Sequence, residues 1–154
     1  MTIEGIHQVL KRLGGFGSHY IREFTYQSMR IDAAIIDMRS RWIRGFEIKV
    51  NRSDWLKDEK WMHYSEFVSS LSVVCPTELI KPEEVNKPFG LLWVEAAGSV
   101  RWVKKPKRFQ RRDAMAWLYR YLEVIEAEFP RVVGECDRLR AELNYERTRK
   151  TEAA

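Results

Sequence analysis

The stretch MRIDAAIIDMRSRWIRGFEIKV, residues 29–50, decides the fold of this chain. Its first part is rich in isoleucine and alanine, which is typical of a buried strand, and its last part ends in the alternating sequence FEIKV. The polar residues 39–41 predict a turn between these parts, so that the two strands fold back on one another. With a further strand expected at residues 19–27, the pattern predicts an antiparallel meander over residues 20–50.

Elements on either side of the meander predict an α/β protein. Helical spacing of apolar residues predicts a first helix that Thr2 caps and that ends at Gly14 and Gly15. A second helix is expected from Asn51 or Ser53 to about residue 67, then a strand at 71–75, a helical turn within 80–85 and a hairpin formed by 90–95 and 100–104. We expect a core at residues 1–109 and C-terminal helices at residues 110–154.

Composition excludes several classes of protein. The chain has 154 residues, of which 45% are hydrophobic and 32% charged, so it is neither a disordered tail nor a membrane protein. No apolar run approaches the ~20 residues of a membrane-spanning helix. The two cysteines, Cys75 and Cys136, are not spaced as Cys-x-x-Cys and suit a reducing compartment, so we expect a cytoplasmic location.

Positive charge is concentrated in one block. The chain carries 27 Lys and Arg against 22 Asp and Glu, and residues 101–112 hold seven basic side chains and no acidic one. Such a block favours a polyanionic partner, although a solvated loop would have the same composition. The residues of this block that we expect to bind nucleic acid are Lys104, Lys105, Lys107 and Arg108.

Three side chains of the meander carry the chemistry that we expect. Glu47 and Lys49 alternate with apolar residues and so share one face of their strand, while Asp32 lies in the strand paired with it. Buried carboxylates are costly unless compensated, and Mg²⁺ prefers one or two carboxylates together with waters and phosphate oxygens. The lysine can then orient water and offset charge on a phosphate, with the Ile48 carbonyl as a further metal ligand. A structural ion pair on a sheet face remains the alternative.

This order of residues resembles the PD-(D/E)XK nuclease superfamily, with Ile31 in place of the proline of the signature. The closer resemblance is to the MmcB-like DNA-repair nucleases and their phage or plasmid relatives. In these an Arg-x-Asp strand leads to a V/F-E-I-K strand and then to S-x-x-D-[FW]-x-x-D-x-K-W-x-x-Y. The resemblance spans about residues 20–108. The matching residues are Arg30, Asp32, Glu47, Lys49, Asp54, Trp55, Asp58, Lys60, Trp61 and Tyr64.

The resemblance implies a restriction endonuclease-like mixed β-sheet flanked by helices, with a Mg²⁺ or Mn²⁺ site. Asp32 and Glu47 would hold the metal, and Lys49 would serve the attacking water. Some relatives add an acid from the first helix or strand, for which Glu23 is preferred over Glu4. We expect Lys60 and Tyr64 to share a helix face, as residues four apart do. The expected nucleic-acid contacts outside the basic block are Arg30, Arg52, Lys57, Lys60 and Tyr64.

A regular apolar stripe runs through the C-terminal helices. Steps of three and four residues connect its members, as in a coiled coil, and Pro130 interrupts it. The stripe either packs on the sheet of its own chain, folds back as a hairpin, or forms a homodimer. The leading hypothesis for the whole chain is therefore a metal-dependent DNA nuclease of structure-dependent or weak sequence preference. The alternatives are a DNA-binding module without turnover and an assembly protein that works through the stripe. The stripe comprises Met115, Leu118, Leu122, Ile125, Phe129, Val132, Cys136, Leu139 and Leu143.

Overall fold

The computed structural model describes residues 1–26, 29–37, 39–40, 42–58, 60–66 and 68–109, together with 125, 130, 134, 137–138 and 140–141. The chain divides into two compact units, Met1–Arg112 and Asp113–Ala154. Every described residue of the second unit is helical. Of the apolar stripe only Ile125 is described, and it is exposed. The rest of the stripe, and with it the predicted homodimer contact, lies outside the described residues.

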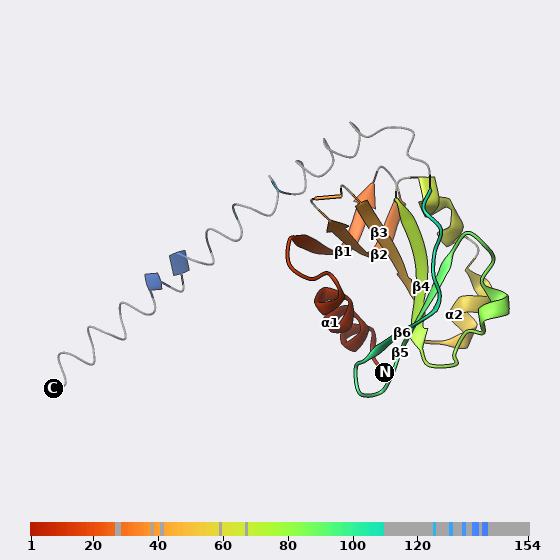
Figure 1. Ribbon diagram of the computed structural model, residues 1–154. Helices are drawn as coiled ribbons and strands as arrows, with labels where there is room; N and C mark the ends of the chain where they lie inside the picture. The colour runs from red at the N-terminus through yellow and green to blue at the C-terminus, as the bar shows by residue number, and fades with distance from the viewer. Residues whose placement is uncertain are drawn as a thin grey trace. The chain divides into compact units, whose positions relative to one another are not determined.

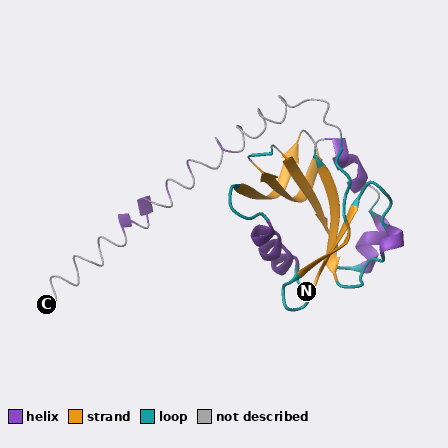
Figure 2. Cartoon of the chain, in the orientation of Figure 1, coloured by secondary structure: helices purple, strands orange, loops and turns teal. Residues whose placement is uncertain are grey.

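The first unit is built on one six-stranded mixed sheet in the order β1-β2-β3-β4-β5-β6 (Figures 1 and 2). The first three strands pair antiparallel, β3, β4 and β5 pair parallel, and β6 returns antiparallel to β5. The predicted meander, the following strand and the hairpin are therefore confirmed. The strands are β1 (Ser18–Tyr26), β2 (Met29–Asp37), β3 (Trp42–Ile48), β4 (Ser70–Pro76), β5 (Gly90–Val94) and β6 (Val100–Lys104).

Helix α1 (Ile3–Leu13) covers one face of this sheet. Thr2 caps it as predicted, since the Gly5 amide donates a hydrogen bond to Thr2 Oγ1 at 3.1 Å. The apolar side of the helix is buried against the sheet, and Figure 1 shows α1 and α2 on opposite sides of the strands. The cluster beneath α1 consists of Ile6, Val9, Leu10, Ala33, Ile35, Phe46, Ile48, Val74, Leu92 and Val94.

The opposite face carries three short helical segments, α2 (Arg52–Lys57), η1 (Lys60–Glu66) and η2 (Pro82–Glu84). The prediction of one helix over residues 51–67 is wrong, because α2 ends at Lys57 and its C-cap residue, Asp58, has an extended backbone with φ −101° and ψ 104°. The chain resumes as the 3-10 helix η1. Positions 60 and 64 therefore do not share a face, because with three residues per turn they lie about 120° apart.

Within the described part of the chain, no helix combines the length and apolar content that crossing a membrane requires.

Candidate active site

The candidate site begins where β2 and β3 separate. Their pairing runs from Asp37–Trp42 to Ala33–Phe46. Just beyond the last pair, Asp32 Oδ2 accepts a hydrogen bond from the Ile48 amide at 2.7 Å. The Lys49 amide donates instead to the Val74 carbonyl of β4 at 2.9 Å. The Asp32 carboxylate thus takes the place of a backbone acceptor on β2. Because the amide and the carbonyl of one strand residue point to the same side, the Ile48 carbonyl also points toward β2 and Asp32.

The strands β1 and β2 are bent at the same level. Arg22 pairs with Ala33 and Phe24 with Ile31, and between them Glu23 has a φ of 48°, a left-handed value that is uncommon for residues other than glycine. Ala33 packs beneath α1. Ile31 points to the other face of the sheet, where its Cδ1 atom lies 3.2 Å from the position that a Cβ atom on Gly45 would occupy. The alternation of side chains between the two faces of β2 is therefore interrupted at Asp32.

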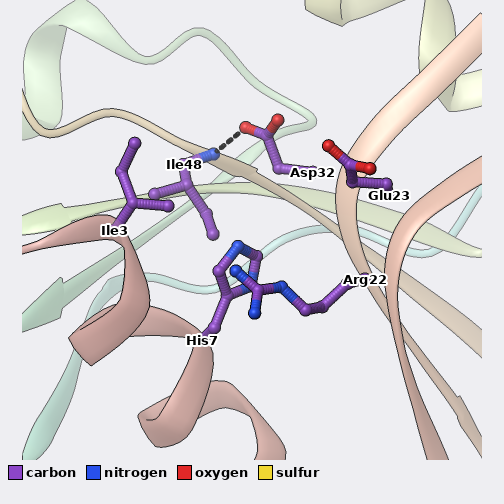
Figure 3. A pocket seen from close by; sticks show the side chains of 6 residues that line it. All are labelled: Ile3, His7, Arg22, Glu23, Asp32 and Ile48. Carbon is purple, nitrogen blue, oxygen red and sulfur yellow. Dashed lines mark hydrogen bonds between the residues drawn. The ribbon is translucent and has the colours of Figure 1, made fainter.

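This bend opens a pocket of about 430 Å³ on the α1 side of the sheet (Figure 3). Asp32 and Glu23 present their carboxylates at one end of it, and His7 and Arg22 lie toward the other. Of the two acids considered for the metal site, Glu23 lines this pocket, whereas Glu4 binds Arg22 at 2.9 Å and Gln8 at 3.0 Å. The six residues that line the pocket are Ile3, His7, Arg22, Glu23, Asp32 and Ile48.

Glu47 and Lys49 share the other face of β3, as their spacing predicts, and both are buried. Lys49 Nζ donates to Glu47 Oε1 at 3.0 Å and to Asp58 Oδ2 at 2.5 Å. The side chains of Glu47 and Lys49 are only 7% and 8% exposed. The second oxygen of Glu47, Oε2, is buried and has no hydrogen-bond partner among the residues that the structure describes. Such an orphaned buried acceptor requires an explanation, and a site for a cation is one.

Charge and burial perturb the groups around Glu47. Burial raises the pKa of Glu47 to about 7, and the negative charge of Asp32 adds to this effect. Burial lowers the pKa of Lys49, but hydrogen bonds to Asp58 and Glu47 outweigh it, so the net pKa is raised and the ammonium stays charged. Burial and the charges of Glu47, Asp58 and Asp32 raise the pKa of Tyr64. Direct hydrogen bonds therefore join Lys49 to Glu47 and Asp58, while Asp32 binds the backbone of Ile48, the residue between Glu47 and Lys49.

These residues fit a hard divalent cation. Two carboxylates, Asp32 and Glu47, one of them with an unsatisfied oxygen, match the one or two that Mg²⁺ commonly takes from a protein. Within the described ranges no three His, Cys, Asp or Glu side chains form a ready cluster of ligands. Waters and substrate oxygens would complete such a coordination shell.

Sequence reasoning missed two residues of this region. Asp58 matches the family motif, but the sequence did not predict it as a partner of Lys49, because the pattern around it continues as a helix. His7 lies on the apolar side of α1 and is buried, with Nδ1 hydrogen-bonded to the Tyr20 hydroxyl. Burial, together with the positive charge of Arg22, lowers the pKa of His7. The helical spacing of His7 with Ile3 and Leu10 is the sequence signal that would have predicted a buried side chain.

Two predicted nucleic-acid contacts are engaged within the chain. The Arg52 guanidinium binds both carboxylate oxygens of Glu84 and the Leu79 carbonyl, which ties α2 to the loop around η2. Lys104 Nζ donates to the Val85 carbonyl. Both side chains therefore have structural contacts that compete with a phosphate.

The remaining predicted contacts differ in exposure. Arg30 is exposed and lies 3.5 Å from Glu23, and Lys57 is exposed at the end of α2. Lys105 and Lys107 are exposed after β6, and the Arg108 guanidinium lies 5.4 Å from the Trp42 ring centre. The side chain of Lys60 lies outside the described residues.

Comparison with known proteins adds a structural neighbour. The chain is similar to the solved structure of the SPO1766 protein of unknown function from Silicibacter pomeroyi, with a TM-score of 0.66 and 21% identity over 86% of this chain and 87% of that one. No protein-family model and no curated protein matches the sequence. At this identity the similarity concerns the fold alone.

Proposed function

We propose that this chain is a metal-dependent DNA nuclease of the PD-(D/E)XK type with a restriction endonuclease-like fold. The observation that carries the proposal is the buried Glu47, which has one unsatisfied oxygen and binds Lys49, with Asp32 bound to the intervening residue Ile48 at the fork of β2 and β3. A buried carboxylate whose pKa is raised to about 7 is costly to ionise. A cation that binds the ionised form offsets that cost.

Asp32, Glu47 and the Ile48 carbonyl would hold Mg²⁺ or Mn²⁺, and Glu23 is a further candidate ligand from the neighbouring strand. When bound, such a cation neutralises phosphate charge and lowers the pKa of a bound water. Asp32 has a second task, since its bond to the Ile48 amide orients both its own carboxylate and the peptide of Ile48.

Lys49 supplies the positive charge of the protein at this site. Its ammonium is buried, charged and held by two carboxylates. In a site with little water, such a fixed donor stabilises charge that develops on phosphate oxygens more than it would in bulk water. It would also orient the attacking water.

Exposed cations would bind the DNA backbone. Phosphate contacts position a duplex without reading its bases, which agrees with structure-dependent or weakly sequence-specific cleavage. The surface proposed here leaves out Arg52 and Lys104, which are engaged within the chain. It consists of the exposed cations Arg30, Lys57, Lys105, Lys107 and Arg108, and Lys60 and the half-buried Tyr64 remain predicted contacts beside them. The nuclease would act in DNA repair, recombination or phage DNA metabolism, in the cytoplasm.

Cleavage of DNA by the purified full chain tests the proposal. Single-stranded, duplex and branched DNA are incubated with Mg²⁺, Mn²⁺ or EDTA. We expect cleavage with either metal and none with EDTA. Asp32→Ala and Glu47→Ala should abolish it, and Lys49→Ala should lower kcat by about 10²–10³-fold while metal affinity is retained. Glu83→Gln, an exposed acid on η2, is the matched control.

Two results would contradict the proposal in different ways. Cleavage by all three variants at the parental rate would mean that the assigned site is wrong. Metal-dependent or metal-independent DNA binding without cleavage would favour a binding module of the same fold.

A further inference from the structure

Asp58 has no task in the proposed function, yet it makes a short, charged contact with Lys49. Its Oδ2 accepts from Lys49 Nζ at 2.5 Å, and its side chain is 27% exposed. It is the C-cap residue of α2, and its backbone is extended there. A continuous helix would have carried the chain past Lys49 without this residue turning toward it.

Aromatic packing holds the chain on both sides of Asp58. Trp55 and Trp61, three residues before and after it, lie with their ring centres 5.7 Å apart. Trp61 is 3% exposed and also meets Phe89 edge-on at 4.7 Å. The position of Asp58 is therefore set by buried contacts, and its backbone is not free to follow the lysine.

The hydrogen bond to Asp58 restricts how the Lys49 ammonium group can rotate. Lys49 Nζ has three N–H donors, of which one reaches Glu47 and one reaches Asp58. A single acceptor would leave the ammonium free to rotate about that bond, since a lysine stem is flexible. Two acceptors fixed in different elements remove the rotation and so fix the direction of the third N–H. The lysine binds one oxygen of Glu47, and the other, Oε2, has no hydrogen-bond partner among the described residues.

We propose that Asp58 is a positioning residue that fixes the Lys49 ammonium so that its third N–H is directed at a DNA phosphate or the attacking water. This inference rests on the proposed function, because Lys49 is assigned its task there. Asp58 acts through Lys49 and contacts neither the DNA nor the metal.

A double-mutant cycle with full kinetic analysis tests the inference. Asp58→Asn should lower kcat by about 10–100-fold, the usual effect of removing a partner that orients a reacting group, with KM for DNA unchanged. The double variant Lys49→Ala/Asp58→Asn should be no slower than Lys49→Ala alone, because the two residues act as one unit. Asp58→Glu, which keeps the charge, should recover part of kcat. Asp54→Asn is the matched control, since Asp54 is exposed on α2 and binds Asn51 at 3.2 Å.

A second measurement uses the unmodified protein without metal or DNA. Nuclear magnetic resonance should show a slowly exchanging Lys49 ammonium with a scalar coupling from Nζ to the Asp58 carboxylate carbon. Absence of this coupling in the folded protein would overturn the inference, even if Asp58→Asn fails to fold.

The remaining outcomes are also decisive. Multiplicative losses in the double variant, or a raised KM with unchanged kcat, would show that Asp58 does not act through Lys49. If the parent protein shows the coupling but cuts no DNA, the proposed function fails while the fixed ammonium is supported.

Discussion

Asp32 binds the backbone of Ile48 through a side-chain carboxylate at the point where β2 and β3 stop pairing. One residue thus closes the fork structurally and presents a carboxylate to the pocket beside it. Asp32 therefore has a structural role and a chemical role, and different substitutions at position 32 should separate them. Asp32→Asn keeps an oxygen acceptor for the Ile48 amide, whereas Asp32→Ala leaves that amide without a partner. We expect the Asp32→Asn variant to be more stable than the Asp32→Ala variant by about 1–3 kcal/mol, the cost of a buried unsatisfied donor.

Urea unfolding of both variants measures this difference, and neither variant should cut DNA. Equal stabilities for the two would show that the Asp32–Ile48 bond does not contribute to the fold.

Glu47 makes stability depend on pH. Its pKa rises from 4.5 to about 7, mainly through burial, so between these values the folded protein binds more protons than the unfolded chain. The free energy of unfolding should therefore fall as pH rises through this window, by about 3 kcal/mol in total. Glu47→Gln is neutral at every pH. It should match the parent near pH 4 and exceed it in stability above pH 7, measured by denaturant unfolding in EDTA with Glu83→Gln as control.

Adding Mg²⁺ extends this experiment. The ion should raise the stability of the parent above pH 7 and leave Glu47→Gln unchanged, because binding to the folded state alone stabilises a protein. A parental stability that does not fall between pH 4.5 and 7 would contradict the buried, costly carboxylate.

Glu23 holds a strained backbone conformation. A left-handed conformation costs an L-residue about 1–2 kcal/mol, and the freedom of glycine in the unfolded chain returns about 0.5–1 kcal/mol of that. Glu23→Gly should therefore be as stable as the parent or up to about 1 kcal/mol more stable. Glu23→Ala, which lacks the carboxylate but keeps the strain, is the comparison. If Glu23 serves the metal, both variants should lose the same activity at different stabilities, as thermal unfolding and cleavage rates would show.

Trp61 anchors η1 beneath the sheet and, through Trp55, the end of α2. Trp61→Ala should lower the free energy of unfolding by about 3–5 kcal/mol because it leaves a large cavity. The neighbouring Met62 is 39% exposed, and Met62→Ala should change stability by less than about 0.5 kcal/mol. Denaturant unfolding compares them, and similar losses for the two would mean that η1 is not anchored through Trp61.

The exposed cations after β6 should bind phosphates. Replacing Lys105, Lys107 and Arg108 with alanine should weaken binding to all DNA sequences alike and flatten its salt dependence. Each phosphate that the variant no longer neutralises should reduce the log–log slope by roughly 0.7–0.9. Lys11→Ala, an exposed cation on α1, should leave the slope unchanged. Binding titrations at several salt concentrations measure this, and an unaltered slope for the triple variant would identify the segment as a solubilising loop.

Local pattern was enough to predict the strands, α1 with its Thr2 cap, and the shared face of Glu47 and Lys49. These features depend on alternation, helical spacing and capping. Such patterns extend over a few residues and can therefore be recognised in the local sequence. The proximity of Asp32 to the strand that carries Glu47 followed from one additional step, the fold-back of two neighbouring strands.

Other features were set by contacts between residues distant in the chain. The helix expected over residues 51–67 breaks because Asp58 turns toward the buried Lys49 and because Trp61 packs against Phe89, and neither contact has a local sequence signal. The engagement of Arg52 with Glu84 and of Lys104 with the Val85 carbonyl is of the same kind. The bend at Glu23 and Asp32, and the pocket it opens toward His7, exist only when two strands and a helix are assembled, because burial and charge at a point depend on everything packed around it.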